Sequence, residues 1–192
     1  MSQLKIEKNE LLNSLILHNF MKNLEYKAII IPTCNDFENI ERAKAAIKFS
    51  KENNLPKRCV ISGLGPDTNI ALGYDKNPGK DKLDFHKSMY DYLMSETDWM
   101  IGADIRSVNS IENILEVFPK GIEGKYALVS YPLHLMRFKK IVKDAKKAGK
   151  ISDSVEIVYV PTKQHMHWAI HEVLSNVKYC LKGKRKYFNI NK

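Results

Sequence analysis

Short apolar runs of strand length alternate with longer segments of helical period through most of this chain. The runs are rich in β-branched residues and span 26–32, 57–62, 99–101, 126–130 and 155–161. Apolar residues recur every three or four positions in 38–53, 84–95, from near 107 to 118, 133–148 and 164–181, which predicts amphipathic helices. Strands separated by helices form βαβ units. We therefore expect an α/β fold with a mostly parallel sheet of about five strands, covered by helices on both faces.

The first 25 residues hold an apolar group with helical rather than continuous spacing. Its members are Leu11, Leu12, Leu15, Ile16, Leu17 and Phe20. Polar residues interrupt this group, acidic residues precede it, and it falls short of the roughly 20 apolar residues that span a bilayer. We therefore expect an amphipathic helix at 1–25 packed on the domain, an α/β domain at 26–182 and a basic tail at 183–192. No membrane partner is expected.

The chain carries a formal net charge of +9 over 192 residues, of which 44% are hydrophobic and 28% charged. This composition is ordinary for one soluble globular domain. The lysines are spread over every predicted helix, and the one dense basic run, 182–186, falls at the predicted tail. A solvated tail is the favoured interpretation, so nucleic-acid binding is not expected. The positive field instead favours an anionic small molecule as the ligand.

Three widely spaced cysteines, Cys34, Cys59 and Cys180, include no C-x-x-C pair. An odd number without metal-binding spacing predicts reduced thiols rather than a disulfide framework or a zinc ribbon. Because disulfides are rare in the cytosol, the pattern indicates a cytoplasmic protein. Cys34 follows the first strand and could be a nucleophile, although a packed thiol is the favoured interpretation.

Three histidines, His165, His167 and His171, lie in or beside the last predicted helix. His167 and His171 are four positions apart on one helix face, which is a metal-binding spacing. However, Glu172 follows the pair, so the order is not that of an H-E-x-x-H motif. We therefore expect no metal site here.

Ligands of open parallel sheets bind beyond the carboxyl ends of the strands. In this chain that rule points to residues 32–36, 62–67, 102–113 and 130–137, where much of its unusual polar chemistry lies. Residues 66–82 carry Gly, Pro, Asp and Asn without periodicity. They predict a long loop of the kind that often serves as a functional lid.

Polar residues surround a predicted helix start within 104–113. They include Asp104, Ser107, Asn109, Ser110, Glu112 and Asn113. Ser107 or Asn109 could cap the helix, and backbone N–H groups at its start would favour an anion. A capping box formed by Asn109 and Glu112 is the simpler alternative, but it leaves Asp104, Ser110 and Asn113 unexplained.

A second polar group follows the strand at 126–130. His134 and Arg137 are three positions apart, so they share one face of the next helix close to the strand end at Ser130. Arginine suits a carboxylate or phosphate, and histidine can act as an acid, a base or a hydrogen-bond donor. Their place in the predicted crevice favours a functional role over a structural one.

These two groups resemble the motifs of the YdcF-like domain family, which includes SanA and ElyC. That family carries an acidic residue followed by S-x-N-T-x-E-N at a helix start, and V-T-S-x-x-H-x-x-R after a later strand. The matching residues here are Asp104, Ser107, Asn109, Ser110, Glu112, Asn113, Val129, Ser130, His134 and Arg137. Arg42 matches an arginine in the helix after the first strand, and Ser62 with Gly63 matches part of an S-G-G turn. The resemblance covers about residues 27–165.

The resemblance implies a Rossmann-like three-layer sandwich. It also makes S-adenosylmethionine a candidate ligand, since one member of the family binds it. The chain departs from the family pattern in the crevice itself. Residues 32–36 replace a glycine-rich turn, Leu64 replaces the second glycine, and the next helix carries Asp84 where the family has an acidic residue one position later. The resemblance therefore implies a fold rather than a particular reaction.

The expected function is an enzyme, a transferase or hydrolase, acting on or with a nucleotide-like or phosphorylated small molecule. His134 would transfer protons, and Asp104 and Glu112 would bind hydroxyls or act as a base. The expected ligand-binding residues are Arg42, Ser62, Gly63, Ser107, Asn109, Ser110, Asn113, Ser130 and Arg137. A non-catalytic binding or regulatory module using the same crevice is the alternative. The sequence leaves the reaction type and the oligomeric state open.

Overall fold

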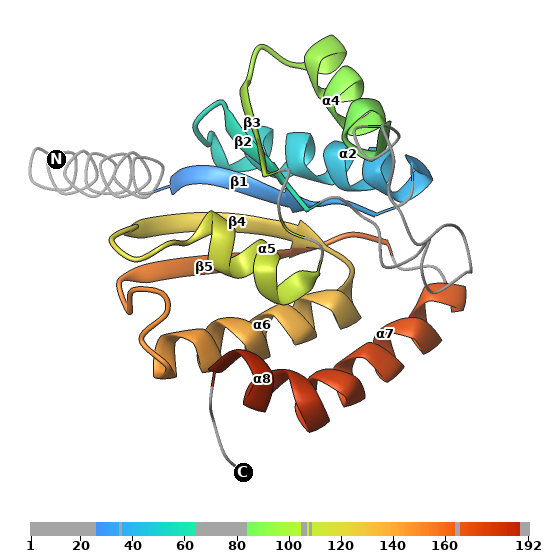
Figure 1. Ribbon diagram of the computed structural model, residues 1–192. Helices are drawn as coiled ribbons and strands as arrows, with labels where there is room; N and C mark the ends of the chain where they lie inside the picture. Colours follow the sequence, from blue (N-terminus) through green and yellow to red (C-terminus); the bar gives the residue numbers. More distant parts are fainter. Residues whose placement is uncertain are drawn as a thin grey trace, which may run out of the picture.

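Five parallel strands form one sheet at the centre of the molecule (Figure 1). The computed structural model describes residues 26–34, 36–63, 84–104, 107, 109–163 and 166–188. Its strands are β1 (Tyr26–Pro32), β2 (Arg58–Ser62), β3 (Met100–Asp104), β4 (Gly124–Ser130) and β5 (Val155–Pro161). They pair in the order β3-β2-β1-β4-β5, and every pairing is parallel. The α/β fold with a parallel sheet of about five strands is thus confirmed.

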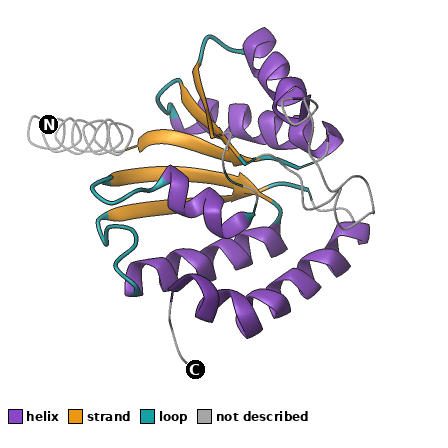
Figure 2. Cartoon of the chain, in the orientation of Figure 1, coloured by secondary structure: helices purple, strands orange, loops and turns teal. Residues whose placement is uncertain are grey.

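Helices cover both faces of this sheet and complete a three-layer, Rossmann-like arrangement (Figure 2). One face carries α2 (Asp36–Asn53) and α4 (Asp84–Glu96), which pack against each other. The other face carries α5 (Ser110–Val117), α6 (Pro132–Lys147), α7 (Met166–Lys178), a π-helix (Tyr179–Gly183) and α8 (Lys184–Phe188). Helices α2, α4, α5 and α6 pack on the strands, as the periodicity predicted. In contrast, α7 and α8 pack on α6 and the π-helix, and α7 leaves Ile170, Val173, Leu174 and Val177 exposed.

The central strands are buried on both faces, so alternate residues enter two separate cores. In β1, Ile29 and Ile31 pack with α2 and α4, whereas Ile30 packs with α5 and α6. In β4, Val129 joins the first core and Leu128 the second. This double burial explains why these strands appear in the sequence as continuous β-branched runs.

The strand order places a topological switch point between β1 and β4. The chain moves outward from β1 through β2 to β3, then returns to the other side of β1 to form β4 and β5. The α2 and α4 crossovers therefore lie on one face, and the α5 and α6 crossovers on the other. Ligand sites of such sheets lie where the two sets diverge, beyond the carboxyl ends of the strands. Here that place is defined by Pro32 and Ser130.

Two elements differ from the sequence expectation. The strand at the sheet edge, β3, continues to Asp104 rather than ending at 101, because it pairs with β2 along its length, up to Ser62. The helix expected to begin near Ser107 begins at Ser110, with Asn109 as its N-cap.

The C-terminal segment also corrects a prediction. The sequence favoured a solvated basic tail from residue 183, but Lys184–Phe188 form α8 and Phe188 is buried in the core with α6. The preceding π-helix is anchored by Tyr179, whose hydroxyl donates to Asp144 of α6 at 2.7 Å. Burial and this neighbouring carboxylate raise the pKa of Tyr179. The dense basic run at 182–186 predicted a tail, although Tyr179 before it and Phe188 after it are both buried.

The helix expected at 1–25 and the long loop expected at 66–82 lie outside the described residues. Among the residues that are described, no helix is both long enough and apolar enough to cross a membrane.

Cys59 of β2 provides a test of the core between the sheet and α2. Burial raises the pKa of its thiol from 9.0 to about 12. From pH 9.0 towards 12 the unfolded thiol ionises while the folded one stays neutral, so the free energy of unfolding falls as the pH rises. We expect a steeper fall in the wild type than in Cys59→Ala, measured by urea unfolding across this pH range. Equal slopes in the two proteins would contradict the buried neutral thiol.

Candidate functional site

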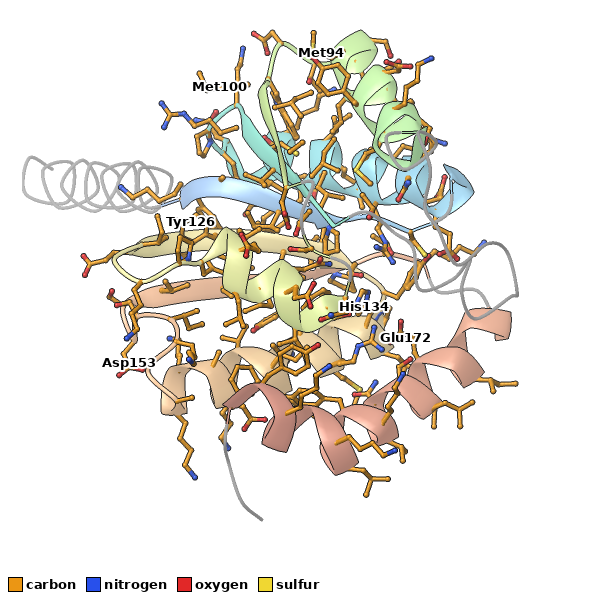
Figure 3. All side chains as sticks on the ribbon, in the orientation of Figure 1. Met94, Met100, Tyr126, His134, Asp153 and Glu172 are labelled. Carbon is orange, nitrogen blue, oxygen red and sulfur yellow. The ribbon has the colours of Figure 1, made fainter. Side chains whose placement is uncertain are left out.

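His134 lies between two serine hydroxyls at the carboxyl ends of the strands. Its Nδ1 is 2.9 Å from Ser130 Oγ, and its Nε2 is 2.9 Å from Ser110 Oγ. The imidazole is only 6% exposed and packs on the ring of Phe138, with centroids 4.2 Å apart. Figure 3 shows it on α6, facing the start of α5. The histidine therefore joins the end of β4 to the beginning of α5.

The tight β4–α6 connection explains this placement. Ser130 ends the strand, Tyr131 is an extended N-cap residue, and Pro132 starts the helix. Proline suits the first turn because its fixed φ is already helical and it lacks an N–H that would need a partner. With only one residue between strand and helix, His134 stands one turn above Ser130 and can reach back to it.

Arg137 completes the contacts of Ser110. Its Nη2 donates to Ser110 Oγ at 2.9 Å and to Glu172 Oε1 at 3.3 Å, and its Nη1 lies 3.3 Å from Glu172 Oε2. The side chains of this ion pair are 12% and 7% exposed. We call Ser110, Ser130, His134, Arg137 and Glu172 the serine–histidine cluster. Four of these five residues are among the predicted site residues.

Glu172 of α7 is the member that the sequence analysis missed (Figure 3). It was weighed only as a possible part of a histidine motif. An available signal was the place of Arg137 in the predicted crevice, because a guanidinium that becomes buried there requires a partner. That signal gives the kind of residue and not its position, since the two residues are 35 positions apart.

The first turn of α5 is held by its own cap. Asn109 Oδ1 accepts hydrogen bonds from the N–H groups of Ile111 and Glu112 at 3.0 Å each, and Asn109 Nδ2 donates to Glu112 Oε1 at 2.7 Å. The capping interpretation of Asn109 and Glu112 is therefore confirmed. Because the cap already occupies two N–H groups, this helix start offers fewer donors to an anion than an uncapped one.

Asp104 forms a separate group at the ends of β2 and β3. Its Oδ2 accepts from Ser62 Oγ at 3.1 Å, and its Oδ1 accepts from the Ser107 N–H at 3.2 Å. Ser62 and Ser107 are both buried. The carboxylate thus ties the turn after β3 to the neighbouring strand.

Gly63 and Asn113 meet between these two groups. Gly63 has φ of +88°, and a Cβ added there would lie 2.5 Å from Asn113 Oδ1. Its carbonyl accepts from Thr33 Oγ1 at 2.5 Å, and its N–H donates to the carbonyl of Asp104 at 3.1 Å. Only glycine combines this backbone angle with so close an approach. The Ser62-Gly63 turn therefore lets α5 approach the end of β2.

Arg42 has a different environment from the one expected. It is 1% exposed, donates to the carbonyls of Pro32 and Thr33 at 2.6 and 3.3 Å, and lies 4.3 Å from the centroid of the Tyr131 ring. These contacts fasten the end of β1 to the start of α6. Both of these hydrogen bonds go to backbone carbonyls, so the geometry gives Arg42 a role in shaping the switch point.

Cys34 lies beside the same structural group. Its thiol donates to Glu38 Oε2 at 3.1 Å, and the Tyr131 hydroxyl lies 3.8 Å from its sulfur. Glu38 is buried. The carboxylate neighbour was not foreseen from the sequence.

The expectation of no metal site at these histidines falls outside what the structure describes, because His165 is not described and neither are the side chains of His167 and His171. Among the described side chains, no group of three or more His, Cys, Asp or Glu could hold a metal ion.

No family model, curated protein or solved structure matches this chain. The resemblance to YdcF-like domains stays a prediction, carried by the motifs alone.

The Arg137–Glu172 pair can be tested by a double-mutant cycle. Removing one member of a buried ion pair leaves the other charge without compensation, so we expect Glu172→Leu and Arg137→Met each to lower the free energy of unfolding by about 3 kcal/mol. The double variant should lose less than the sum, with a coupling of about 1 kcal/mol or more in urea unfolding. The exposed Glu41–Lys44 pair is the matched control, where coupling should stay below about 1 kcal/mol. Equal coupling in both pairs would contradict the buried pair.

Proposed function

We propose that this protein is an enzyme, a hydrolase or transferase, acting on a phosphorylated or nucleotide-like small molecule beyond the carboxyl ends of β1 and β4. The single observation that carries the proposal is the hydrogen-bonded series Ser110–His134–Ser130, with Arg137 on the outer hydroxyl. A residue that moves protons must be held in one orientation within hydrogen-bond reach of a reacting group. His134 is held in this way on both nitrogens.

The tautomer of His134 determines what the cluster can do. With its proton on Nδ1, the imidazole donates to Ser130 Oγ and accepts from the Ser110 hydroxyl at Nε2. This arrangement leaves Nε2 as the proton acceptor towards Ser110, which is partly exposed, whereas Ser130 is fully buried. Proton transfer therefore proceeds on the Ser110 side.

Two positive features support an anionic ligand. The guanidinium of Arg137 donates to the same serine that His134 contacts, and arginine matches phosphate geometry. The formal net charge of +9 adds a long-range attraction for anions. The proposal includes membership of the YdcF-like family and makes S-adenosylmethionine a candidate ligand.

A non-catalytic binding or regulatory module is the second candidate, and the Arg137–Glu172 pair favours it. The carboxylate already neutralises the guanidinium, so an incoming anion must compete with Glu172 for Arg137. Such competition suits a site whose contacts change when ligand binds. The two candidates share one site and differ in whether His134 transfers protons.

Binding of AMP tests the anion site, with adenosine as the uncharged counterpart. Loss of one charge-assisted hydrogen bond costs about 1.5–3 kcal/mol, so Arg137→Met should weaken AMP binding about ten-fold or more in isothermal titration calorimetry. Adenosine binding should change much less. Lys143→Met, which removes an exposed cation from the same helix, is the control and should bind AMP like the wild type.

Additional ligands separate the remaining alternatives. S-adenosylmethionine and glucose 6-phosphate should be compared with AMP by thermal shift on the same three proteins. If Arg137→Met binds every ligand as the wild type does, the site assignment is wrong. Turnover that disappears in His134→Gln while binding persists favours the enzyme over the binding module. Steep salt dependence with a polynucleotide, unaffected by either substitution, would favour a nucleic-acid surface instead.

A further inference from the structure

We propose that Ser110 is the nucleophile of this site, and that it takes up the phosphoryl group of a phosphate monoester as a covalent phosphoserine. This inference rests on the proposed function, which requires only a phosphorylated ligand near His134. It adds the reaction class, phosphomonoester hydrolysis, and gives Ser110 a role beyond ligand binding.

Ser110 is singled out by comparing the three serines whose hydroxyls have partners at the strand ends. Ser62 is buried and donates to the Asp104 carboxylate. Ser130 is buried at the base of the cluster, against His134 Nδ1. Ser110 alone of the three is partly exposed, and its oxygen contacts both a potential base and a cation. A serine nucleophile needs that combination of access and activation.

His134 is placed to remove the proton of Ser110. The Nε2–Oγ distance is 2.9 Å, within the range for direct proton transfer. Ser130, 2.9 Å from Nδ1, orients the ring, and its hydroxyl can accept the Nδ1 proton in the tautomer that leaves Nε2 as acceptor. The Phe138 ring limits its rotation from the side. The nucleophile, the base and the orienting group are thus hydrogen-bonded in that order, as in other activated serines.

Arg137 gives the preference for phosphate over an uncharged ester. Its Nη2 lies 2.9 Å from Ser110 Oγ, so the positive charge faces the oxygen that carries negative charge when the proton leaves. A phosphoryl group bonded to that oxygen would bring its own oxygens beside the guanidinium. Glu172 of α7 orients the guanidinium of Arg137 and is therefore a positioning residue. Arginine at a transferring phosphoryl group stabilises the transition state electrostatically.

The reaction balances without an oxidant or reductant. Ser110 Oγ attacks phosphorus, the P–O bond to the alcohol breaks, and the serine proton passes through His134 Nε2 to the leaving oxygen. Water then attacks the phosphoserine and gives its proton to His134. The Ser110–phosphorus bond breaks, the proton returns to Ser110 Oγ, and inorganic phosphate leaves. The sum is ester plus water to alcohol plus phosphate.

The test uses the full chain with p-nitrophenyl phosphate, followed by absorbance, and with AMP, followed by phosphate release. Acid quenching during turnover and peptide mass spectrometry should locate one phosphoryl group on Ser110. Ser110→Ala should lower the rate about 100-fold or more, and His134→Gln should do the same. Ser110→Thr keeps a hydroxyl and should retain part of the activity and the label. Ser95→Ala, on an exposed part of α4, is the control and should match the wild type.

The outcomes separate this proposal from the function on which it rests. Hydrolysis that survives in a folded Ser110→Ala protein, or a wild type that turns over with no label on Ser110, overturns the nucleophile and leaves the enzyme standing. A wild type that binds AMP but hydrolyses neither compound also overturns it. Failure of the wild type to bind AMP, S-adenosylmethionine or glucose 6-phosphate overturns the proposed function itself. Circular dichroism of each variant identifies any loss caused by unfolding.

Discussion

A buried imidazole with both nitrogens hydrogen-bonded holds the site of this protein together. The ring of His134 is nearly excluded from solvent, so each nitrogen needs a partner if burial is not to cost several kcal/mol. Ser130 supplies one from the end of β4, and Ser110 supplies the other from the start of α5. These two hydrogen bonds join the start of α5 to the end of β4, so they fix how the α5 crossover meets the sheet. The positions of Arg137 and Glu172 follow from that placement.

The fold was largely predictable because the central strands β1 and β4 are buried on both faces. The sequence shows continuous apolar runs at 28–32 in β1, 126–129 in β4 and 157–161 in β5. Strand order was not predictable in this way. The sequence of β3 does not mark it as an edge strand, and its largely exposed pattern is visible only in the structure. The C-terminal helix was missed for a different reason. Its basic residues indicated a tail, whereas its fold is decided by Tyr179 and Phe188, whose burial depends on α6.

The cluster was predictable where local spacing alone brings its residues together. Ser130, His134 and Arg137 lie within two turns of one helix and the strand before it, so their proximity follows from secondary structure alone. Ser110 joins them because the α5 crossover begins at the edge of the parallel sheet where β4 ends. Arg42 and Glu172 could not be placed in this way, because their environments depend on tertiary contacts. Arg42 turns to backbone carbonyls at the end of β1, and Glu172 comes from a helix formed much later in the chain.

The two serines that contact His134, Ser110 and Ser130, differ in their exposure to solvent. A histidine that served only to join two elements would be best shielded on both sides, since solvent weakens a structural hydrogen bond. Ser130 meets that requirement, but Ser110 is partly open to solvent and carries a second contact from a guanidinium. That contact places a cation on the oxygen whose proton His134 is positioned to accept. The Arg137–Glu172 ion pair alone would not require the contact of the guanidinium with Ser110, whereas in an acid–base pair that contact stabilises the charge that proton transfer creates. Under the proposed function, the open side of the cluster is therefore the side on which its charge is arranged for reaction.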